Sequence, residues 1–213
     1  MKRQLFIFTI GLTSLHALAD NASWYVKPYL GLSSISDQQG TLVQAANNTD
    51  ITTNTDSGFT SGIALGYQYN AHYSAELGWE YRSSDTDSQL SANDNSYGGN
   101  YASSLFFLNG FYHLASSSDW TPYVGAGLAW VQEVDLDLEL NGTEQSYSGD
   151  GDTGYQLMLG VDYAIGSQWQ ANAELRYLTI GDIDLQGEEN ATGELRGFDY
   201  DPMTLSVALK YRF

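Results

Sequence analysis

The residues of this sequence that could do chemistry are charged side chains set two positions apart. Glu76, Glu80 and Arg82 share one parity in the segment 73–83, and Glu174 and Arg176 do so in the segment 169–180. Residues two apart in an extended strand project to the same face. We therefore expect these carboxylates to form ion pairs with bases. The expected members of this network are Lys27, Glu76, Glu80, Arg82, Glu174, Arg176, Lys210 and Arg212.

Acidic side chains also occur in pairs with the same spacing. The pairs are Asp135 and Asp137, Asp150 and Asp152, Asp182 and Asp184, and Asp199 and Asp201. Ca²⁺ takes about six to eight oxygen ligands, but none of these pairs has the spacing of a dedicated calcium-binding loop. We therefore predict no metal site.

The balance of charge excludes one large class of partner. With 26 Asp and Glu against 8 Lys and Arg, the formal net charge is -18. A protein that binds a phosphate backbone needs clustered basic side chains to release counterions, so nucleic acid is not the partner.

The hydrophobic content of 42% and the aromatic content of 14% are too high for a disordered chain. The chain has no Cys, so its stability does not depend on disulfides.

The N-terminus predicts export. Lys2 and Arg3 precede an apolar stretch at 5–12, and Ala17-Leu18-Ala19 has the small residues of a cleavage site. We predict a signal peptide over residues 1–19, which is removed, and one domain over residues 20–213. A short membrane anchor is the alternative for this segment.

Beyond the N-terminus, apolar and polar residues alternate with period two, which is typical of strands with two different faces. In the fourth of the alternating segments, Phe106 and Leu108 are expected to face the same side as the other apolar residues, although Phe107 then faces the polar side. The fifth segment, which begins at residue 121, keeps its apolar residues at one parity as far as Leu140. The eight segments are 24–33, 58–69, 73–83, 102–114, 121–140, 153–163, 169–180 and 203–213.

The connections and the faces of these segments predict a transmembrane barrel. Short connections alternate with long polar ones, which places the two kinds at opposite ends. The interior of an eight-stranded barrel has room only for filling side chains, too little for every Tyr, Trp, Leu and Phe of the apolar faces. If these apolar side chains face outward instead, charged side chains such as Glu76 and Arg176 face inward and are hidden from lipid. We therefore predict an all-β fold: an eight-stranded antiparallel up-and-down transmembrane β-barrel with three short turns and four long loops.

Short motifs add a resemblance to small eight-stranded outer-membrane proteins of Gram-negative bacteria. TPYVGAGL at 121–128, GVDY at 160–163, the pair at 201–202 and the ending at 211–213 look most like the OmpW family, whereas AELGWEY at 75–81 is more similar to the OmpA type. The resemblance implies an outer-membrane location, with the short turns in the periplasm and the long loops outside the cell. It also implies that the outer-membrane assembly machinery reads a C-terminal signal formed by Leu209, Tyr211 and Phe213.

The resemblance leaves two functions open. An OmpW-like barrel would facilitate the passage of small hydrophobic compounds, whereas a plugged structural or adhesion-type barrel would use acidic loops to contact cations, a host or phage. A passage needs an apolar funnel that leads to a lateral opening, and a plug needs Glu76, Glu80 and Glu174 to be paired. A narrow gate whose ion pairs exchange partners is a further alternative.

The expected partners follow from the position of the acidic residues. All of them fall in the four outer segments except Asp20, Glu76, Glu80, Asp119, Asp162 and Glu174. Such a rim repels the phosphates of lipopolysaccharide unless divalent cations bridge the two, so we expect contact with outer-membrane lipids and lipopolysaccharide through such cations.

No enzymatic activity is expected. Enzymes built on barrels of this kind use His near the outer rim, whereas His72 falls in a short turn and His113 near the same end of the barrel. Neither could reach an outer-leaflet substrate beside a Ser or Asp. We therefore predict no catalytic residues and no cofactor.

Overall fold

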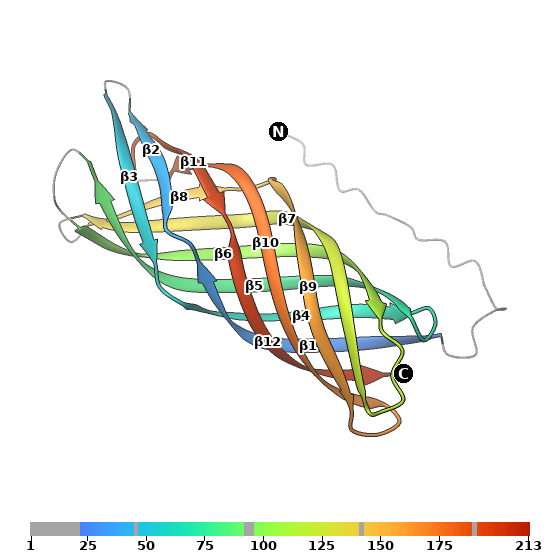
Figure 1. The fold of residues 1–213 in the computed structure, drawn as a ribbon. Helices are drawn as coiled ribbons and strands as arrows, with labels where there is room; N and C mark the ends of the chain where they lie inside the picture. The colour runs from blue at the N-terminus through green and yellow to red at the C-terminus, as the bar shows by residue number, and fades with distance from the viewer. Residues whose placement is uncertain (1–21, 45–46, 92–95, 141–142, 189–190) are drawn as a thin grey trace.

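The computed structural model of the chain describes residues 22–44, 47–91, 96–140, 143–188 and 191–213, which form one antiparallel sheet of twelve strands (Figure 1). The predicted signal peptide and its cleavage site after Ala19 lie outside the described residues. The strands are β1 (Ser23–Ile35), β2 (Gln38–Gln44), β3 (Asn47–Thr55), β4 (Gly58–Gln68), β5 (Tyr73–Leu90), β6 (Ser96–His113), β7 (Trp120–Leu140), β8 (Thr143–Gly149), β9 (Thr153–Ala164), β10 (Trp169–Gly187), β11 (Glu194–Tyr200) and β12 (Pro202–Arg212).

Eight of these strands pair in a closed ring, which we call the barrel section. Around the ring, β1 pairs with β4, β4 with β5, β5 with β6, β6 with β7, β7 with β9, β9 with β10, β10 with β12, and β12 with β1. Short connections at 69–72, 114–119 and 165–168 lie at the end where β12 finishes (Figure 1). Closure leaves no strand edge, as a sheet in hydrocarbon requires.

The remaining four strands continue the wall in a second ring, which we call the extension. β2 pairs with β3, β3 with β5, β7 with β8, β8 with β10, β10 with β11, and β11 with β2, while β5, β6 and β7 stay paired into this region. The prediction of eight strands joined by four long loops therefore gives the wrong number of strands. The barrel section has the predicted eight strands, and the extension adds four more. The segments predicted to be loops also bury apolar side chains, such as Leu42, Tyr147 and Leu195, which pack into one interior cluster and hold these segments as strands of the wall.

In the barrel section the apolar residues face outward, as predicted. Exposed apolar side chains come from every strand of the ring and include Leu32, Leu65, Leu77, Leu108, Val124, Leu159, Leu175 and Leu205. Near the short connections, Trp120 packs on Tyr163 and Trp169 on Tyr211, with ring centroids 4.6 and 4.7 Å apart. Rings of this kind form the aromatic girdles of transmembrane barrels.

The register predicted for the fourth segment is confirmed. Phe106, Leu108 and Tyr112 are exposed, and Phe107 and Phe111 are buried inside the barrel. The two inward rings are not anomalous, because each lies beside a buried cation: Phe107 beside Arg176 and Phe111 beside Lys27.

A β-bulge reverses the faces of β7 between the two sections. β7 extends to Leu140, as predicted, but its pairing to β6 shifts by one residue where Leu105 faces Val131 and Ser104 faces Glu133. The apolar residues of even number are exposed up to Trp130, whereas Val134, Leu136 and Leu138 are buried. An inserted residue moves every later side chain to the other face.

Within the described residues, no helix is long and apolar enough to cross a membrane.

Candidate functional site in the barrel interior

The strongest candidate site is a set of charged side chains inside the barrel section. They project inward from alternate positions of β1, β5, β10 and β12, so strand geometry alone brings them together. The structure buries seven of the eight predicted residues, which are Lys27, Glu76, Glu80, Arg82, Glu174, Arg176 and Lys210. The eighth, Arg212, lies near the end of β12 at intermediate burial, and its Nε has no hydrogen-bond partner.

Six of these residues form one continuous chain of ion pairs. The Nζ of Lys27 lies 2.6 Å from Glu76 Oε2 and 3.7 Å from Glu174 Oε2. Arg176 lies 2.7 Å from Glu174 Oε1 through Nη2 and 2.8 Å from Glu80 Oε2 through Nη1.

The chain ends where Arg82 donates through Nε to Glu80 Oε1. Three carboxylates and three cations cancel, so this interior holds no net charge that would attract ions.

A second pair lies beside the first chain. Lys210 Nζ is 2.7 Å from Asp162 Oδ2, and Asn172 Nδ2 donates to Asp162 Oδ1 at 2.8 Å. The sequence reasoning did not include Asp162 among the candidates. Its signal was available, because Asp162 shares the inward parity of Gln156 and Met158 in the segment 153–163.

Two tyrosines that the sequence reasoning also missed complete the hydrogen bonds of the acids. Tyr25 donates its phenol to Glu76 Oε1 at 2.9 Å, and Tyr123 donates to Glu174 Oε2 at 2.7 Å. Each ring lies over the glycine paired with it on the neighbouring strand, Gly66 under Tyr25 and Gly160 under Tyr123, where a Cβ would overlap the ring. Small residues in the wall therefore make room for these aromatic donors.

Aromatic rings also cover the cations. The guanidinium of Arg176 lies 5.4 Å from the ring of Tyr29 and 5.1 Å from that of Phe107, and Arg82 lies 5.9 Å from Tyr200. Rings at such distances attract cations and displace water from them. The ion pairs thus lie in a packed interior.

The interior of the extension is mainly apolar, although it also buries a few polar side chains such as Gln38, Thr53 and Ser88. Where the barrel section buries charges, the extension buries aliphatic and aromatic side chains, and the two interiors meet at Phe107 and Tyr200. The buried cluster consists of Ile35, Leu42, Ile51, Tyr101, Leu105, Phe107, Ala129, Val131, Val134, Leu136, Leu138, Tyr147, Leu178, Ile180, Ile183, Leu185, Ala191, Leu195, Phe198 and Tyr200.

Comparison with known proteins agrees with this architecture. The family described as outer membrane protein beta-barrel domain matches residues 5–213. The chain belongs to this family. An apolar exterior around a buried, charged interior is the arrangement that the membrane requires of such a barrel. The protein is thus an outer-membrane β-barrel, and its family supports a location in the outer membrane.

Solved structures with the same fold share little sequence with this outer-membrane barrel. The outer membrane protein OprG from Pseudomonas aeruginosa has a TM-score of 0.69 at 15% identity, with 90% of this chain and 96% of that chain covered. Neisserial surface protein A has a TM-score of 0.51 at 18% identity, with coverage of 91% and 100%. At such identities the likeness shows the fold alone. No curated protein matches the sequence.

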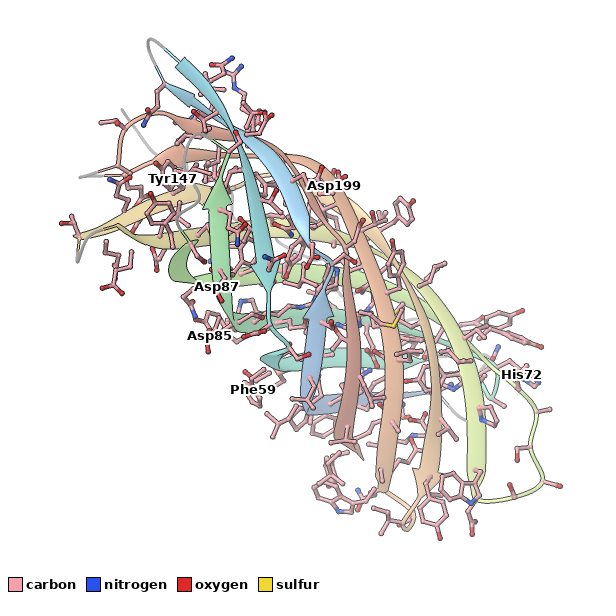
Figure 2. All side chains as sticks on the ribbon, turned by 60° about the vertical axis from the view of Figure 1, so that its left-hand side comes forward. Phe59, His72, Asp85, Asp87, Tyr147 and Asp199 are labelled. Atoms are coloured by element: carbon pink, nitrogen blue, oxygen red, sulfur yellow. The ribbon has the colours of Figure 1, made fainter. Side chains whose placement is uncertain are left out.

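The outer-membrane barrel carries its acidic residues mainly on the outside of the extension, as Asp85, Asp87 and Asp199 illustrate (Figure 2). Partial burial raises the pKa of Asp135 to about 6, and Glu133, Asp137 and Glu188 add to the rise. Burial likewise raises the pKa of Asp152, with Asp184 and Asp150 contributing. Among the described residues, no group of three or more acidic or histidine side chains is gathered for a metal ion.

The surroundings of His113 differ from the expectation. His113 Nε2 lies 2.8 Å from the hydroxyl of Ser74, and its Nδ1 lies 3.9 Å from Asp162 Oδ2, so a Ser and an Asp do flank it. All three side chains are buried, and Asp162 is already bound by Lys210 and Asn172. His72 lies in the connection after β4, at the end far from the extension (Figure 2).

The predicted C-terminal signal lies on the outer face of β12. Leu209 is exposed, and the ring of Phe213 packs edge-on against Tyr211 with centroids 5.4 Å apart. Its reading by the assembly machinery stays a prediction.

Proposed function

We propose that this outer-membrane barrel admits small hydrophobic molecules from outside the cell and releases them sideways into the membrane, while it blocks water and ions. The observation that carries the proposal is the change in interior polarity, from the apolar cluster that fills the extension and reaches Phe107 to a neutral, ion-paired floor in the barrel section. An apolar solute is stabilised when its surface leaves water for such an interior, whereas a sugar or an ion gives up favourable hydration without compensation.

The orientation follows from the rule for outer-membrane barrels, which have short periplasmic turns and longer outer segments. The connections at 69–72, 114–119 and 165–168 would then lie in the periplasm, and the extension would project from the cell. In this orientation the apolar interior faces the source of the solutes. The ion-paired floor prevents their direct release into the periplasm.

The wall offers a lateral exit at the seam between β1 and β12. Their pairing runs from Tyr25 to Ile35, but Lys27 and Pro28 have no partner in it, since Pro28 has no N–H to donate. A groove of about 600 Å³ lies outside this place, between Leu30 and Ile63 on one side and Val207 on the other.

On the inner side of β1, Tyr29 follows the unpaired Lys27 and Pro28, and its ring lies over Gly62 of the neighbouring strand β4. A turn of the Tyr29 ring would connect the groove to the floor of the apolar interior, because the same ring lies beside Arg176.

A second function is favoured by a different observation. Glu76, Glu80 and Glu174 are all paired, and the cluster in the extension is packed at exposures below 9%. Such an interior suits a sealed scaffold whose acidic exterior contacts lipopolysaccharide through divalent cations, a host surface or phage. In this reading the chain has no transport role.

Both functions are tested by uptake into liposomes that contain the refolded protein. Passage predicts selective uptake of a small apolar solute over a small sugar and inorganic ions. A sealed scaffold predicts no flux above empty liposomes, and sugar or ion flux would contradict both proposals.

The exit is tested by locking the seam, which a chain without Cys allows cleanly. Leu30 and Val207 face each other across β1 and β12 next to the gap, so the oxidised pair L30C/V207C should reduce apolar uptake at least tenfold, and reductant should restore it. The matched control L65C/L77C locks the continuous pairing of β4 and β5 and should leave uptake unchanged. Equal uptake by the two locked barrels would reject the exit at this seam.

A further inference from the structure

Aromatic rings accompany the buried cations of the floor, and one cation has more of them than the others. Each buried Lys and Arg among the described residues lies against an aromatic ring, and Arg176 alone lies against two. These rings are Tyr29 and Phe107, with centroids 5.4 and 5.1 Å from the guanidinium carbon. Phe107 belongs to the apolar cluster, and Tyr29 lies on β1 beside the seam. Arg176 therefore lies where the apolar interior meets the proposed exit.

The polar contacts of Arg176 leave its faces to these rings. Its Nε and Nη2 atoms donate to Glu174 Oε1 at 3.2 and 2.7 Å, and its Nη1 atom donates to Glu80 Oε2 at 2.8 Å. The N–H groups of a guanidinium lie in its plane, so hydrogen bonds use its edge and aromatic rings stack on its flat faces. Arg176 is buried, and the proposed exit leads into lipid. Water is therefore not at hand to replace a ring that moves away.

The opening of the exit removes one of the two rings. When Tyr29 turns to connect the groove with the interior, Arg176 keeps only Phe107. A solute that leaves by this route takes the place of the Tyr29 ring beside the guanidinium. The face of an aromatic solute restores the cation–π contact, whereas a saturated solute of the same size offers only C–H groups.

We propose that the barrel selects aromatic over saturated apolar solutes, and that Arg176 and Tyr29 determine this selectivity. The proposal rests on the passage proposed above and names the class of solute that the passage prefers. A cation–π contact that is shielded from water corresponds to about 5- to 30-fold in affinity. An aromatic solute stabilises the state in which Tyr29 is turned, so its passage should be faster by about the same factor. The groove outside the seam, of about 600 Å³, has room for a six-membered ring and is lined by Trp79 on β5.

The first test compares fluorobenzene with fluorocyclohexane, which are matched in ring size and in their single fluorine. Uptake into liposomes that contain the refolded wild type is followed by ¹⁹F NMR, and the rate for empty liposomes is subtracted. Fluorobenzene should enter at least about fivefold faster. Equal uptake of the two solutes would overturn the selectivity and leave the passage standing. No uptake of either solute would overturn the passage, and the selectivity with it.

The second test measures binding without transport. Tyr29→Ala leaves a ring-sized space beside Arg176 and removes no charge. Apolar cavities made in this way bind small rings such as benzene. In detergent micelles, Tyr29→Ala should bind fluorobenzene saturably, at least about fivefold more tightly than fluorocyclohexane, and fluorobenzene should raise its thermal unfolding midpoint.

The matched control creates a similar space away from the cations. Phe198 is buried over Gly40 in the extension and lies against none of the buried Lys and Arg side chains of the described residues. Phe198→Ala should therefore bind the two solutes within twofold of each other. The selectivity is overturned if Tyr29→Ala binds both solutes equally, or if Phe198→Ala shows the same preference. If Tyr29→Ala does not fold, the ratio of uptake rates in the wild type decides alone.

Discussion

The Nη1 atom of Arg176 lies 2.8 Å from the Oε2 atom of Glu80, and this contact joins β10 to β5 across the interior of the barrel. Glu80 also accepts from Arg82, so one carboxylate serves two buried guanidinium groups. Replacing Glu80 with Ala leaves both cations buried with one partner fewer. We expect a loss of about 3–5 kcal/mol in the free energy of unfolding, which is typical when one partner of a buried pair is removed.

This loss is measured from urea unfolding in micelles, followed by tryptophan fluorescence. Glu80→Gln, which keeps the acceptor but not the charge, should fall between the wild type and Glu80→Ala. Glu139→Ala, at an exposed position of β7, should change the free energy of unfolding by less than about 0.5 kcal/mol. If Glu80→Ala is as stable as Glu139→Ala, the ion pairs do not hold the interior together.

Glu174 connects the two halves of the ion-pair chain, because it contacts both Lys27 and Arg176. Replacing it with Ala leaves Lys27 with Glu76 and Arg176 with Glu80, so the barrel should still fold, but with space and unpaired donors in its floor. We expect Glu174→Ala to raise the conductance for small ions at least severalfold over the wild type in planar bilayers.

The isosteric variant Glu174→Gln fills the same space and should conduct no better than the wild type. Selective uptake of an apolar solute should change little in either variant, since the proposed exit at Tyr29 does not involve Glu174. A folded Glu174→Ala barrel that conducts no ions would show that packing of Phe107, Phe111 and Met158 seals the floor by itself.

Much of this interior could be predicted, because a period of two in the sequence corresponds directly to two faces in a strand. That rule placed Glu76, Glu80 and Glu174 inside without any knowledge of their partners. The partners depend on which strands face each other across the barrel, which no local pattern encodes. The distant contacts even repeat: Tyr25 binds Glu76 and Tyr123 binds Glu174, each across 51 positions.

The extension could not be predicted in the same way. Leu128 and Leu136 have one parity, yet Leu128 is exposed on the barrel section and Leu136 is buried in the extension. The bulge between them at Val131–Glu133 inserts one residue, and the apolar residues then resume the same parity on the other face, so the one local sign of the reversal is polar Gln132 at the apolar parity. The four segments taken for loops are polar enough to look like loops, and only the pairing of distant strands makes them part of a wall.

The exposed apolar face predicts a cost for charge in the membrane. Leu159 on β9 is 58% exposed in the barrel section, and Leu159→Arg should cost about 2–4 kcal/mol if the residue lies near the middle of the bilayer. The measurement is the folding free energy in lipid vesicles. Gln89→Arg, at an exposed position of β5 in the extension, should cost less than about 1 kcal/mol. Similar costs at the two positions would contradict the division into a membrane section and an extension.

The acidic exterior of the extension predicts a pH dependence with a definite sign. Partial burial raises the pKa of Asp135 to about 6, so its charged form is less favourable in the folded protein than in the unfolded chain. Its contribution to stability is therefore fully present below pH 4 and is lost as the pH rises through 6. Because Asp135 is partly exposed, solvent screening limits the effect to about 1 kcal/mol or less.

Asp135→Asn should be more stable than the wild type at pH 8 and nearly equal to it at pH 4, as measured by urea unfolding at each pH. Asp85→Asn, which removes an exposed carboxylate of β5, should show no such difference between the two pH values. A gain at pH 8 that persists unchanged at pH 4 would mean that Asn improves packing, and that the titration of Asp135 has no part in it.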